Sequence, residues 1–327
     1  MVDLLEKLTQ VNGVSGDEGE VRDILKNELS PWVDKIHIDR MGNLIAYKKS
    51  SKPNAGKIML AAHMDEVGFI ITRIGDDGML KFKTIGSIDP RVLVSKRVKV
   101  GKSACPGVLG IKAIHLQEKE ERDKAVELKN MYIDIGANSK EEAFDSSWVL
   151  MGENKVKTKA LDDRVGCTVL AEALKEKYDA DVYACFTVQE EVGLRGAGVA
   201  AYEVQPDLAL VIEGTTCSNV PGVEEYMYST IMGDGPAISI IDHTTYGNKE
   251  IVDKLINTAK EENITYQIKK SNSGGNDAGR IHITGEGIKT AVISVPCRYI
   301  HSPSSIMDFD DLKNTVKLVR EFLKGCE

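Results

Sequence analysis

Residues 182–188 and the two acids that follow them decide what kind of sheet this chain can build. This apolar, β-branched run ends close to Glu190 and Glu191, and a glycine-punctuated segment comes next. The pattern predicts a buried strand that stops at a functional site, with a helix beyond it. Two acids can also simply favour the start of a helix, where unpaired N–H groups and the helix dipole attract negative charge. The other strand ends distinguish these interpretations.

The same pattern recurs elsewhere in the chain. Acids or histidines follow further predicted strands or precede a predicted helix: His63 and Asp65 after 58–62, Asp162 and Asp163 before 165–177, Glu213 after 208–212, and His301 after 290–295. Because ligands of open α/β sheets bind at the carboxyl ends of the strands, these side chains should converge. Oxygen and imidazole donors without sulfur suit a pair of borderline or hard divalent cations. The sequence thus predicts a site for two metal ions.

Residues of this set have plausible chemical roles, each with an ordinary structural alternative. Asp65, two residues after His63, can accept the other imidazole N–H and fix the tautomer. Asp162 can bridge two cations about 3.5–4 Å apart while Asp163 braces it or orients Arg164, although paired acids at a helix start are also common caps. The two glutamates after the 182–188 strand point in different directions, so one can bind metal while the other stays free as a base.

The rest of the chain predicts an α/β domain with an insertion. In the second half, strands separated by helices indicate a mostly parallel sheet flanked by helices. Residues 67–158 instead show the short strands and turns of a small β-barrel or sandwich. We therefore expect a discontinuous catalytic domain, residues 1–66 and 159–327, that holds an inserted β domain, residues 67–158. The S-x-x-E patterns at Ser15–Glu18 and Ser139–Glu142 predict helix starts.

Composition excludes several kinds of partner. A net charge of -8 without a basic stripe argues against nucleic acid. No segment reaches the roughly 18 apolar residues of a membrane span, and no secretory signal is visible. The 6 cysteines lack a C-x-x-C spacing, which argues against a structural zinc knuckle. We expect a cytoplasmic protein whose partners are small molecules or peptides.

Six motifs occur in order along the chain. They are His63-x-Asp65, Ala160–Arg164, Gln189–Ala197, Glu213–Thr215, Gly274–Gly279 and Arg298–Pro303. Together they resemble the TET-type (glutamyl) aminopeptidase family of di-metal exopeptidases, some members of which carry an endoglucanase label. Three positions depart from the commoner pattern of that family: Glu213 stands in place of Asp, Asn276 in place of Thr, and Ser305 in place of an acid.

The resemblance implies a role for each matching residue and a zinc-aminopeptidase-like fold. The implied metal ligands are His63 and Glu213 for one ion, Glu191 and His301 for the other, and Asp162 as the bridge. Glu190 is then the general base, with Asp65 behind the first histidine. The resemblance further implies two zinc or cobalt ions, attack of a metal-bound hydroxide on short peptide substrates, and homo-oligomers in which dimers formed through the inserted domain build toward a dodecamer.

Three other functions are compatible with parts of this pattern. A di-metal deacylase or carboxypeptidase would share the sheet and the ligands. An endoglucanase-type glycoside hydrolase would need two acids and usually an aromatic-lined groove, whereas aromatic residues make up only 6% of this chain. A non-catalytic binding protein would be expected to have lost Glu190 or a ligand. The remaining histidines are expected to be structural or surface groups: His37, His115, His243 and His282.

Overall fold

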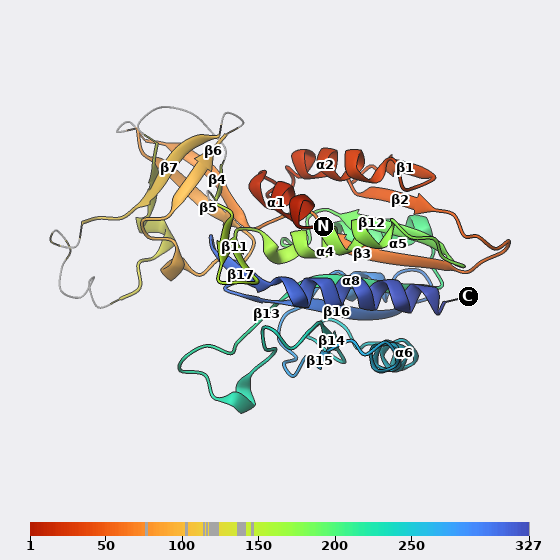
Figure 1. Cartoon of the computed structure of the whole chain (residues 1–327). Coiled ribbons are helices and arrows are strands. Elements are labelled where there is room, and N and C mark those ends of the chain that lie inside the picture. The colour runs from red at the N-terminus through yellow and green to blue at the C-terminus, as the bar shows by residue number, and fades with distance from the viewer. Residues whose placement is uncertain are drawn as a thin grey trace.

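The structure, a computed structural model, describes the chain except for residues 76–77, 102–103, 114, 116, 118–123, 136–141, 145–146 and 327. Figure 1 shows a large sheet covered by helices and, beside it, a β-barrel. The strand pairing gives the sheet eleven strands and closes the barrel. This architecture confirms the predicted fold class, an α/β fold with a mostly parallel central sheet and an inserted β domain.

The large sheet has a parallel centre. Its strands follow the order β1-β2-β12-β3-β13-β16-β17-β11-β10, and β14 and β15 extend it beside β16. The bounds are β1 Lys35–Ile38, β2 Leu44–Lys48, β3 Lys57–His63, β10 Val149–Met151, β11 Lys155–Thr158, β12 Asp181–Thr187, β13 Leu208–Thr216, β14 Ala237–Ser239, β15 Gln267–Ile268, β16 Lys289–Arg298 and β17 Ser305–Asp308. Because β12, β3, β13 and β16 run parallel, their carboxyl ends meet at one edge of the sheet.

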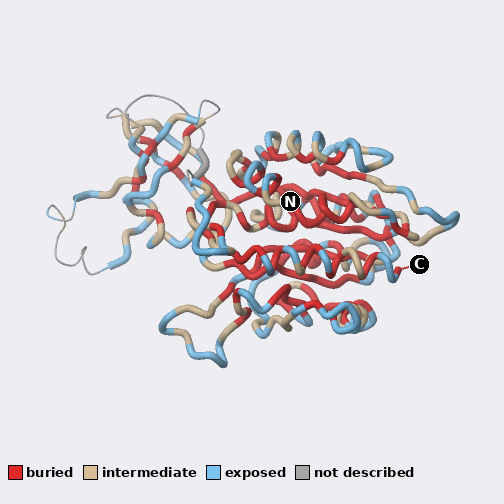
Figure 2. The backbone as a smooth tube through the Cα atoms, viewed as in Figure 1, coloured by how far each residue is buried: buried red, intermediate tan, exposed pale blue. Residues whose placement is uncertain are grey.

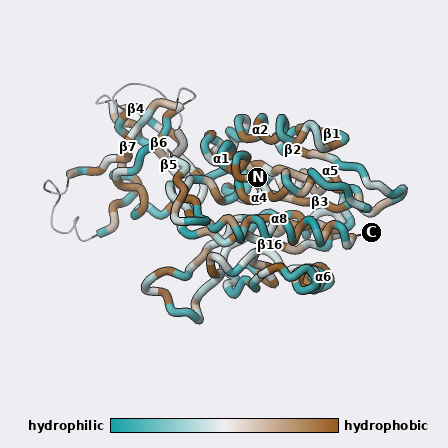
Figure 3. Tube along the Cα trace, viewed as in Figure 1, coloured by the Kyte–Doolittle hydropathy of each residue, from teal (hydrophilic) through white to brown (hydrophobic). Residues whose placement is uncertain are grey.

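Alternate residues of the central strands pack into two different core layers, because successive side chains of a strand point to opposite faces. In β3, Ile58, Leu60 and Ala62 belong to one layer, whereas Met59 and Ala61 belong to the other. Figure 2 shows these strands as the buried interior, and in Figure 3 hydrophobic residues lie along them. A strand that is buried on both faces needs an unbroken apolar sequence, and β3 has one.

Helices pack on both core layers. The larger layer includes residues of α1 (Val2–Gln10), α2 (Gly19–Leu29), α4 (Leu161–Ala173), α6 (Lys249–Glu261) and α8 (Phe309–Lys324). The smaller layer includes residues of α5 (Arg195–Val204) and α7 (Ala278–Ile281). No helix in the described part of the chain combines the length and the apolar content that a membrane crossing requires.

Six strands form the closed barrel in the order β4-β5-β8-β7-β6-β9. Their bounds are β4 Gly68–Ile74, β5 Leu80–Ile85, β6 Arg97–Val100, β7 Cys105–Gly110, β8 Tyr132–Asp134 and β9 Glu142–Phe144. The barrel has a hydrophobic cluster of its own, which includes Phe69, Leu80 and Ile133. The strands β10 and β11 lie within 67–158 but pair with the large sheet through β17, so the barrel strands end before that boundary.

The first S-x-x-E pattern, Ser15–Glu18, does not form the predicted capping box. Helix α2 begins at Gly19, and its N-cap residue Glu18 makes no side-chain cap bond. The hydroxyl of Ser15 donates instead to the carboxylate of Asp65 at 2.6 Å, because a charged acceptor offers a stronger hydrogen bond than a helix end. In the second pattern, residues 139–141 lie outside the described part of the chain. Its last residue begins β9, which pairs with β4 and β6 to close the barrel.

A buried ion-pair network joins the N-terminal segment to the start of α4. Lys159 Nζ lies 2.7 and 3.0 Å from the two carboxylate oxygens of Glu66, and Arg164 Nη2 lies 3.3 Å from one of them. None of these side chains is more than 3% exposed. Lys159 also donates to the carbonyl of Val11 at 2.7 Å, and Arg164 donates to the carbonyl of Leu8. One carboxylate therefore balances two buried cations.

We expect Glu66→Gln to lower the free energy of unfolding by about 3–5 kcal/mol, because removing one partner leaves uncompensated charge in a dry interior. Urea denaturation of the two proteins measures the change. The control is Asp253→Asn, which breaks the exposed Lys249–Asp253 pair of α6 and should leave the unfolding midpoint within experimental error. Equal unfolding midpoints for wild type and Glu66→Gln would contradict the proposed contribution of the buried ion-pair network to stability.

Candidate metal centre

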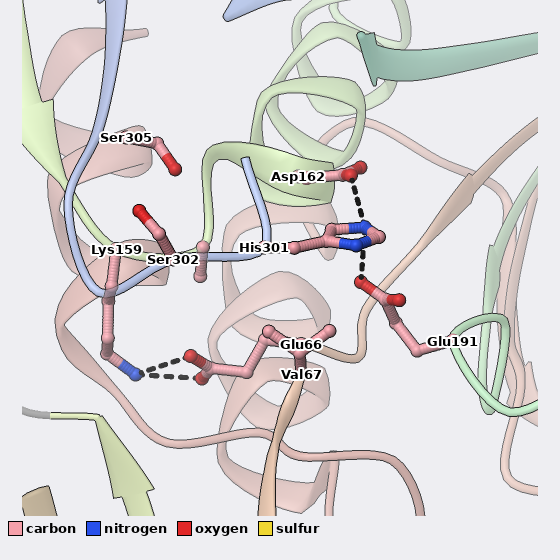
Figure 4. Close-up of a pocket in the computed structure, with 9 residues that line it drawn as sticks. Glu66, Val67, Lys159, Asp162, Glu191, His301, Ser302 and Ser305 are labelled. Carbon is pink, nitrogen blue, oxygen red and sulfur yellow. Dashed lines mark hydrogen bonds and ion pairs between the residues drawn. The ribbon is translucent and has the colours of Figure 1, made fainter. Parts of the chain in front are cut away.

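Side chains from five separate segments meet at the carboxyl edge of the parallel strands. His63 ends β3, Glu190 and Glu191 follow β12, Glu213 lies near the end of β13, His301 lies between β16 and β17, and Asp162 lies in the first turn of α4. The structure thus brings together six of the seven candidate metal-binding and catalytic side chains that the sequence singled out, and the seventh, Asp65, follows His63 by two residues. Figure 4 shows Asp162, His301 and Glu191 from three of these segments turned toward one another.

Asp162 stands between the two histidines. Its Oδ1 lies 3.4 Å from His63 Nε2, and its Oδ2 lies 3.3 Å from His301 Nε2. Glu213 Oε2 lies 3.6 Å from His63 Nε2, and Glu191 Oε1 lies 3.5 Å from His301 Nε2. Each histidine is therefore paired with its own glutamate, and the single aspartate faces both pairs.

Among the described residues, two buried carboxylate oxygens of this cluster, Asp162 Oδ1 and Glu213 Oε1, accept no hydrogen bond. Ligand atoms of Asp162, Glu191 and His301 lie within 4.8 Å of one another, as do those of His63, Asp163 and Glu213. Buried carboxylate oxygens are costly unless they are paired or coordinate a metal. The donor set, imidazole nitrogen and carboxylate oxygen with no thiolate, fits divalent cations.

The pKa values of the cluster also indicate uncompensated negative charge. Burial raises the pKa of Glu190 and of Glu213 well above the ordinary range, and neighbouring carboxylates raise each further. Burial likewise raises the pKa of Glu191 to about 7. Burial alone would lower the pKa of His301, but the carboxylates of Asp162 and Glu191 outweigh it and raise that pKa to about 9. A bound cation would relieve this mutual repulsion.

Asp65 supports the site differently from the sequence prediction. The imidazole Nδ1 of His63 donates to the main-chain carbonyl of Asp65 at 3.0 Å, whereas the Asp65 carboxylate lies farther away, at 3.5 Å. This bond leaves Nε2 free to face the cluster. The carboxylate itself accepts from the backbone N–H groups of Glu190 (3.0 Å) and Glu191 (3.2 Å). The carbonyl therefore fixes the tautomer, and the carboxylate holds the next strand end.

For Asp163, the expectation was that it braces Asp162 or orients Arg164, and its contacts do not support the second of these roles. Its carboxylate accepts from the backbone N–H of His63 at 3.2 Å and of Gly166 at 3.0 Å. Arg164, which Asp163 was expected to orient, instead bonds to Glu66 and to main-chain carbonyls. The peptide bond between Asp162 and Asp163 is cis. Asp163 thus joins the end of β3 to the first turn of α4.

A cavity of about 360 Å³ opens beside the cluster. Beyond the candidate ligands, its walls carry hydroxyl groups, glycines and one cation, Lys269: the wall residues include Thr215, Thr216, Ser229, Ser273, Gly274, Gly275 and Asn276. None of the residues that line it is Phe, Tyr or Trp. The cavity that adjoins the cluster is therefore predominantly polar.

Asn276 and Ser305, two of the residues that differ from the commoner family pattern, form hydrogen bonds within loops beside the cluster. Asn276 Nδ2 donates to Asp242 at 2.8 Å, and its Oδ1 accepts from the backbone N–H of Ala278 at 3.0 Å. Ser305 Oγ donates to the carbonyl of Tyr299 at 3.1 Å, in the segment that carries His301. Both residues shape the surroundings of the cluster, whereas Glu213, the third departure, lies within it.

Further residues near the site were not assigned a role from the sequence. Asp277 is fully buried and accepts from the hydroxyl of Thr187, and burial raises its pKa to about 6. Its only sequence signal is its place in the Gly274–Gly279 motif.

Of the histidines expected outside the site, His37 pairs with Glu203, and His282 donates to the carbonyl of Ala278 at 2.7 Å.

The fold and the site define an α/β protein with a candidate centre for divalent cations at the carboxyl ends of its parallel strands. The sequence pattern of the M42 glutamyl aminopeptidase family matches residues 42–318. A putative aminopeptidase of Acetivibrio thermocellus is 42% identical over 334 residues, 98% of each chain. A lysyl aminopeptidase of Pyrococcus furiosus is 32% identical, over 99% of this chain and 97% of its own length. The chain therefore belongs to the M42 glutamyl aminopeptidase family.

Solved structures agree with this assignment. An aminopeptidase of Desulfurococcus kamchatkensis superposes with a TM-score of 0.95 at 39% identity, over 99% of this chain and 94% of that chain. The TET1 peptidase of Pyrococcus horikoshii gives 0.86 at 30% identity, over 99% of both chains. A Thermotoga maritima protein described as an endoglucanase gives 0.81 at 35% identity, over 98% and 96%. The protein is thus an aminopeptidase, a hydrolase of peptide bonds, and its family implies use of a divalent metal.

We expect Asp162→Asn to weaken the binding of divalent ions to chelator-treated protein by at least about tenfold, because a neutral amide is a poorer ligand and this side chain faces both histidines. Calorimetric titration with Zn²⁺ measures the affinity. Asp179→Asn, which alters an exposed carboxylate just before the start of β12, at the end of that strand opposite to Glu190 and Glu191, is the matched control and should bind as wild type does. Unchanged affinity in Asp162→Asn would contradict the proposed centre.

Proposed function

We propose that the protein removes N-terminal residues from short peptides with the help of two zinc or cobalt ions. His63 and Glu213 would hold one ion, Glu191 and His301 the other, and Asp162 would bridge them. The observation that carries this proposal is the position of Asp162, whose two oxygens lie 3.4 and 3.3 Å from different histidines. Nitrogen and oxygen donors without thiolate suit such ions.

Glu190 is the general base in this proposal. Its side chain is 11% exposed and lines the cavity, and its carboxylate lies 3.9 Å from His63 Nε2, beyond hydrogen-bond distance. The bound ions would supply Lewis-acid activation of water and of the first peptide carbonyl. Glu190 takes the proton of the water as the new C–O bond forms, and it delivers that proton to the amine that leaves when the C–N bond breaks.

The alternatives are less well supported. An endoglucanase usually has an aromatic-lined groove, and the residues that line this cavity include no Phe, Tyr or Trp. A deacylase or carboxypeptidase would share the ligands, and comparing free-amine with amino-blocked substrates separates these activities.

Five of the six free cysteines are buried, which supports the expected cytoplasmic location, where thiols stay reduced.

We expect Glu190→Gln to lower kcat by roughly 10²–10⁴ without loss of either metal, because only the proton acceptor is removed. Glu191→Gln should instead lose part of its metal and recover activity when excess ion is added, because the amide is a poorer ligand. Turnover of aminoacyl amides, metal content and melting temperature are measured side by side for both variants.

The two variants are matched controls for each other, since each replaces one carboxylate of the same loop by an amide. If both acids merely favoured a helix start, each change would cost a fraction of a kcal/mol in stability and leave turnover intact. An active Glu190→Gln enzyme would refute the assignment of the base. Full activity in exhaustively metal-free wild type would refute the metal dependence.

We also propose that residues 67–158 form an assembly domain through which dimers build toward a dodecamer. The inserted barrel has its own core and lies beside the large sheet in Figure 1. Support comes from the similar Pyrococcus horikoshii TET1 peptidase, which can assemble into a tetrahedron or a large octahedral shell. Closed symmetric assembly is common among homo-oligomers.

Light scattering coupled to size-exclusion chromatography should therefore give a mass of about twelve chains, or of dimers at low concentration. A strictly monomeric mass at micromolar concentration would refute the assembly proposal and leave the chemistry untouched.

A further inference from the structure

Three consecutive backbone N–H groups of the loop after β12 donate to carboxylates. The N–H of Gln189 donates to Glu18 Oε1 at 3.3 Å. The N–H groups of Glu190 and Glu191 donate to the two oxygens of Asp65, at 3.0 and 3.2 Å. This loop leaves the strand ladder at Thr187, so these groups have no partner in the sheet. The carboxylates therefore fix the backbone that carries the proposed base and one proposed ligand.

The N-terminal loop between α1 and α2 completes this arrangement. Ser15 Oγ donates to Asp65 Oδ2 at 2.6 Å, the same oxygen that accepts from Glu191. Glu18 Oε1 also accepts from the N–H of Gly16 at 2.7 Å, which ties its side chain back to its own loop. Asp65 is 0% exposed and Glu18 is 4% exposed, so water competes little for these bonds.

The N-terminal loop between α1 and α2 is anchored independently of the contacts that Ser15 and Glu18 make. Val14 forms a parallel bridge to Glu66, and the backbone N–H of Glu66 donates to the carbonyl of Gly13 at 2.9 Å. The carboxylate of Glu66 in turn accepts from the N–H of Gly13 at 3.1 Å. Since the buried cations bind that same carboxylate, the position of Ser15 is set by the core and not by the site.

The loop after β12 needs external support because its own backbone is unfavourable. Gln189 has a φ of 58°, in the left-handed region that side chains other than glycine rarely adopt. Such residues persist only where their surroundings hold them, and they cluster at functional sites. A carboxylate whose rotation is restrained by Ser15 can hold two adjacent N–H groups in a fixed direction.

We propose that Ser15 is a positioning residue for the reaction, which acts through Asp65 on the backbone of Glu190 and Glu191, and that Glu18 adds the same support at Gln189. The inference rests on the proposed function, because it assigns the support to the proposed base and ligand. Nothing in the 15–18 segment touches the reacting atoms in this proposal. The segment that resembles a capping box thereby supports the backbone of the active-site residues.

The test is a graded series at Ser15, assayed as the metal-loaded protein. Ser15→Ala should lower kcat by about 10–100-fold with KM within about twofold, as loss of a group that orients a site residue does. Ser15→Thr keeps the hydroxyl and should restore most of the rate. Ser15→Cys, a weaker donor, should fall between the two. Glu18→Ala should lower kcat in the same direction.

The matched control is Ser51→Ala, because Ser51 Oγ also donates to an aspartate carboxylate, that of Asp179, in a pair that lies outside the candidate site. It should leave kcat unchanged. A purely structural role for Ser15 predicts loss of melting temperature without a kcat difference among folded variants. Wild-type kcat in Ser15→Ala, or equal kcat in Ser15→Thr and Ser15→Cys, would overturn the proposal.

The outcome is separable from failure of the proposed function. If Glu190→Gln keeps full turnover, the assignment of the base fails whatever the Ser15 series shows. If Glu190→Gln is inactive and the Ser15 series is flat, only the positioning role fails. Should Ser15→Ala not fold, the comparison of the threonine and cysteine variants decides the question.

Discussion

Mutual repulsion among buried carboxylates is the constraint on which this structure depends. The parallel strands bring acids from separate segments to one edge, where Glu213 is 7% exposed and Glu191 is 5% exposed. Anions packed this closely in a medium of low dielectric raise one another's pKa, and they stay ionised only beside compensating charge. The two histidines offset part of this charge. The negative charge that remains favours the binding of divalent cations at this edge of the sheet.

Comparison of the acids shows which of them the protein satisfies by itself. Glu66 meets two buried cations, Lys159 and Arg164, and its charge is used to hold the core together. Asp65 is satisfied by backbone and hydroxyl donors. Asp162 and Glu213, in contrast, each keep a buried oxygen that accepts no hydrogen bond within the described chain. Structural acids and candidate metal ligands are therefore distinguished by their partners and not by their burial.

The frame around the site is built from parts far apart in sequence. The first turn of α4, the end of β3 and the N-terminal loop are tied together through Asp163, Glu66 and Ser15. These contacts restrain the backbone on which the candidate ligands stand, and catalytic geometry tolerates little displacement. The cavity walls combine hydroxyl groups of β13, those of Thr215 and Thr216, with Lys269, which follows β15.

The sequence by itself determined the class of fold and the residues that gather at the site. Apolar runs that end in His63, Glu190 or Glu213 predict buried parallel strands, and parallel strands must present their carboxyl ends at one edge. The sequence could not show that the Ser15–Glu18 pattern braces Asp65 and the 189–191 loop, that the carbonyl of Asp65 fixes the tautomer, or that β10 and β11 join the large sheet. Local patterns encode periodicity and caps, whereas the choice among hydrogen-bond partners distant in sequence depends on which groups packing brings together, and only the tertiary structure decides that.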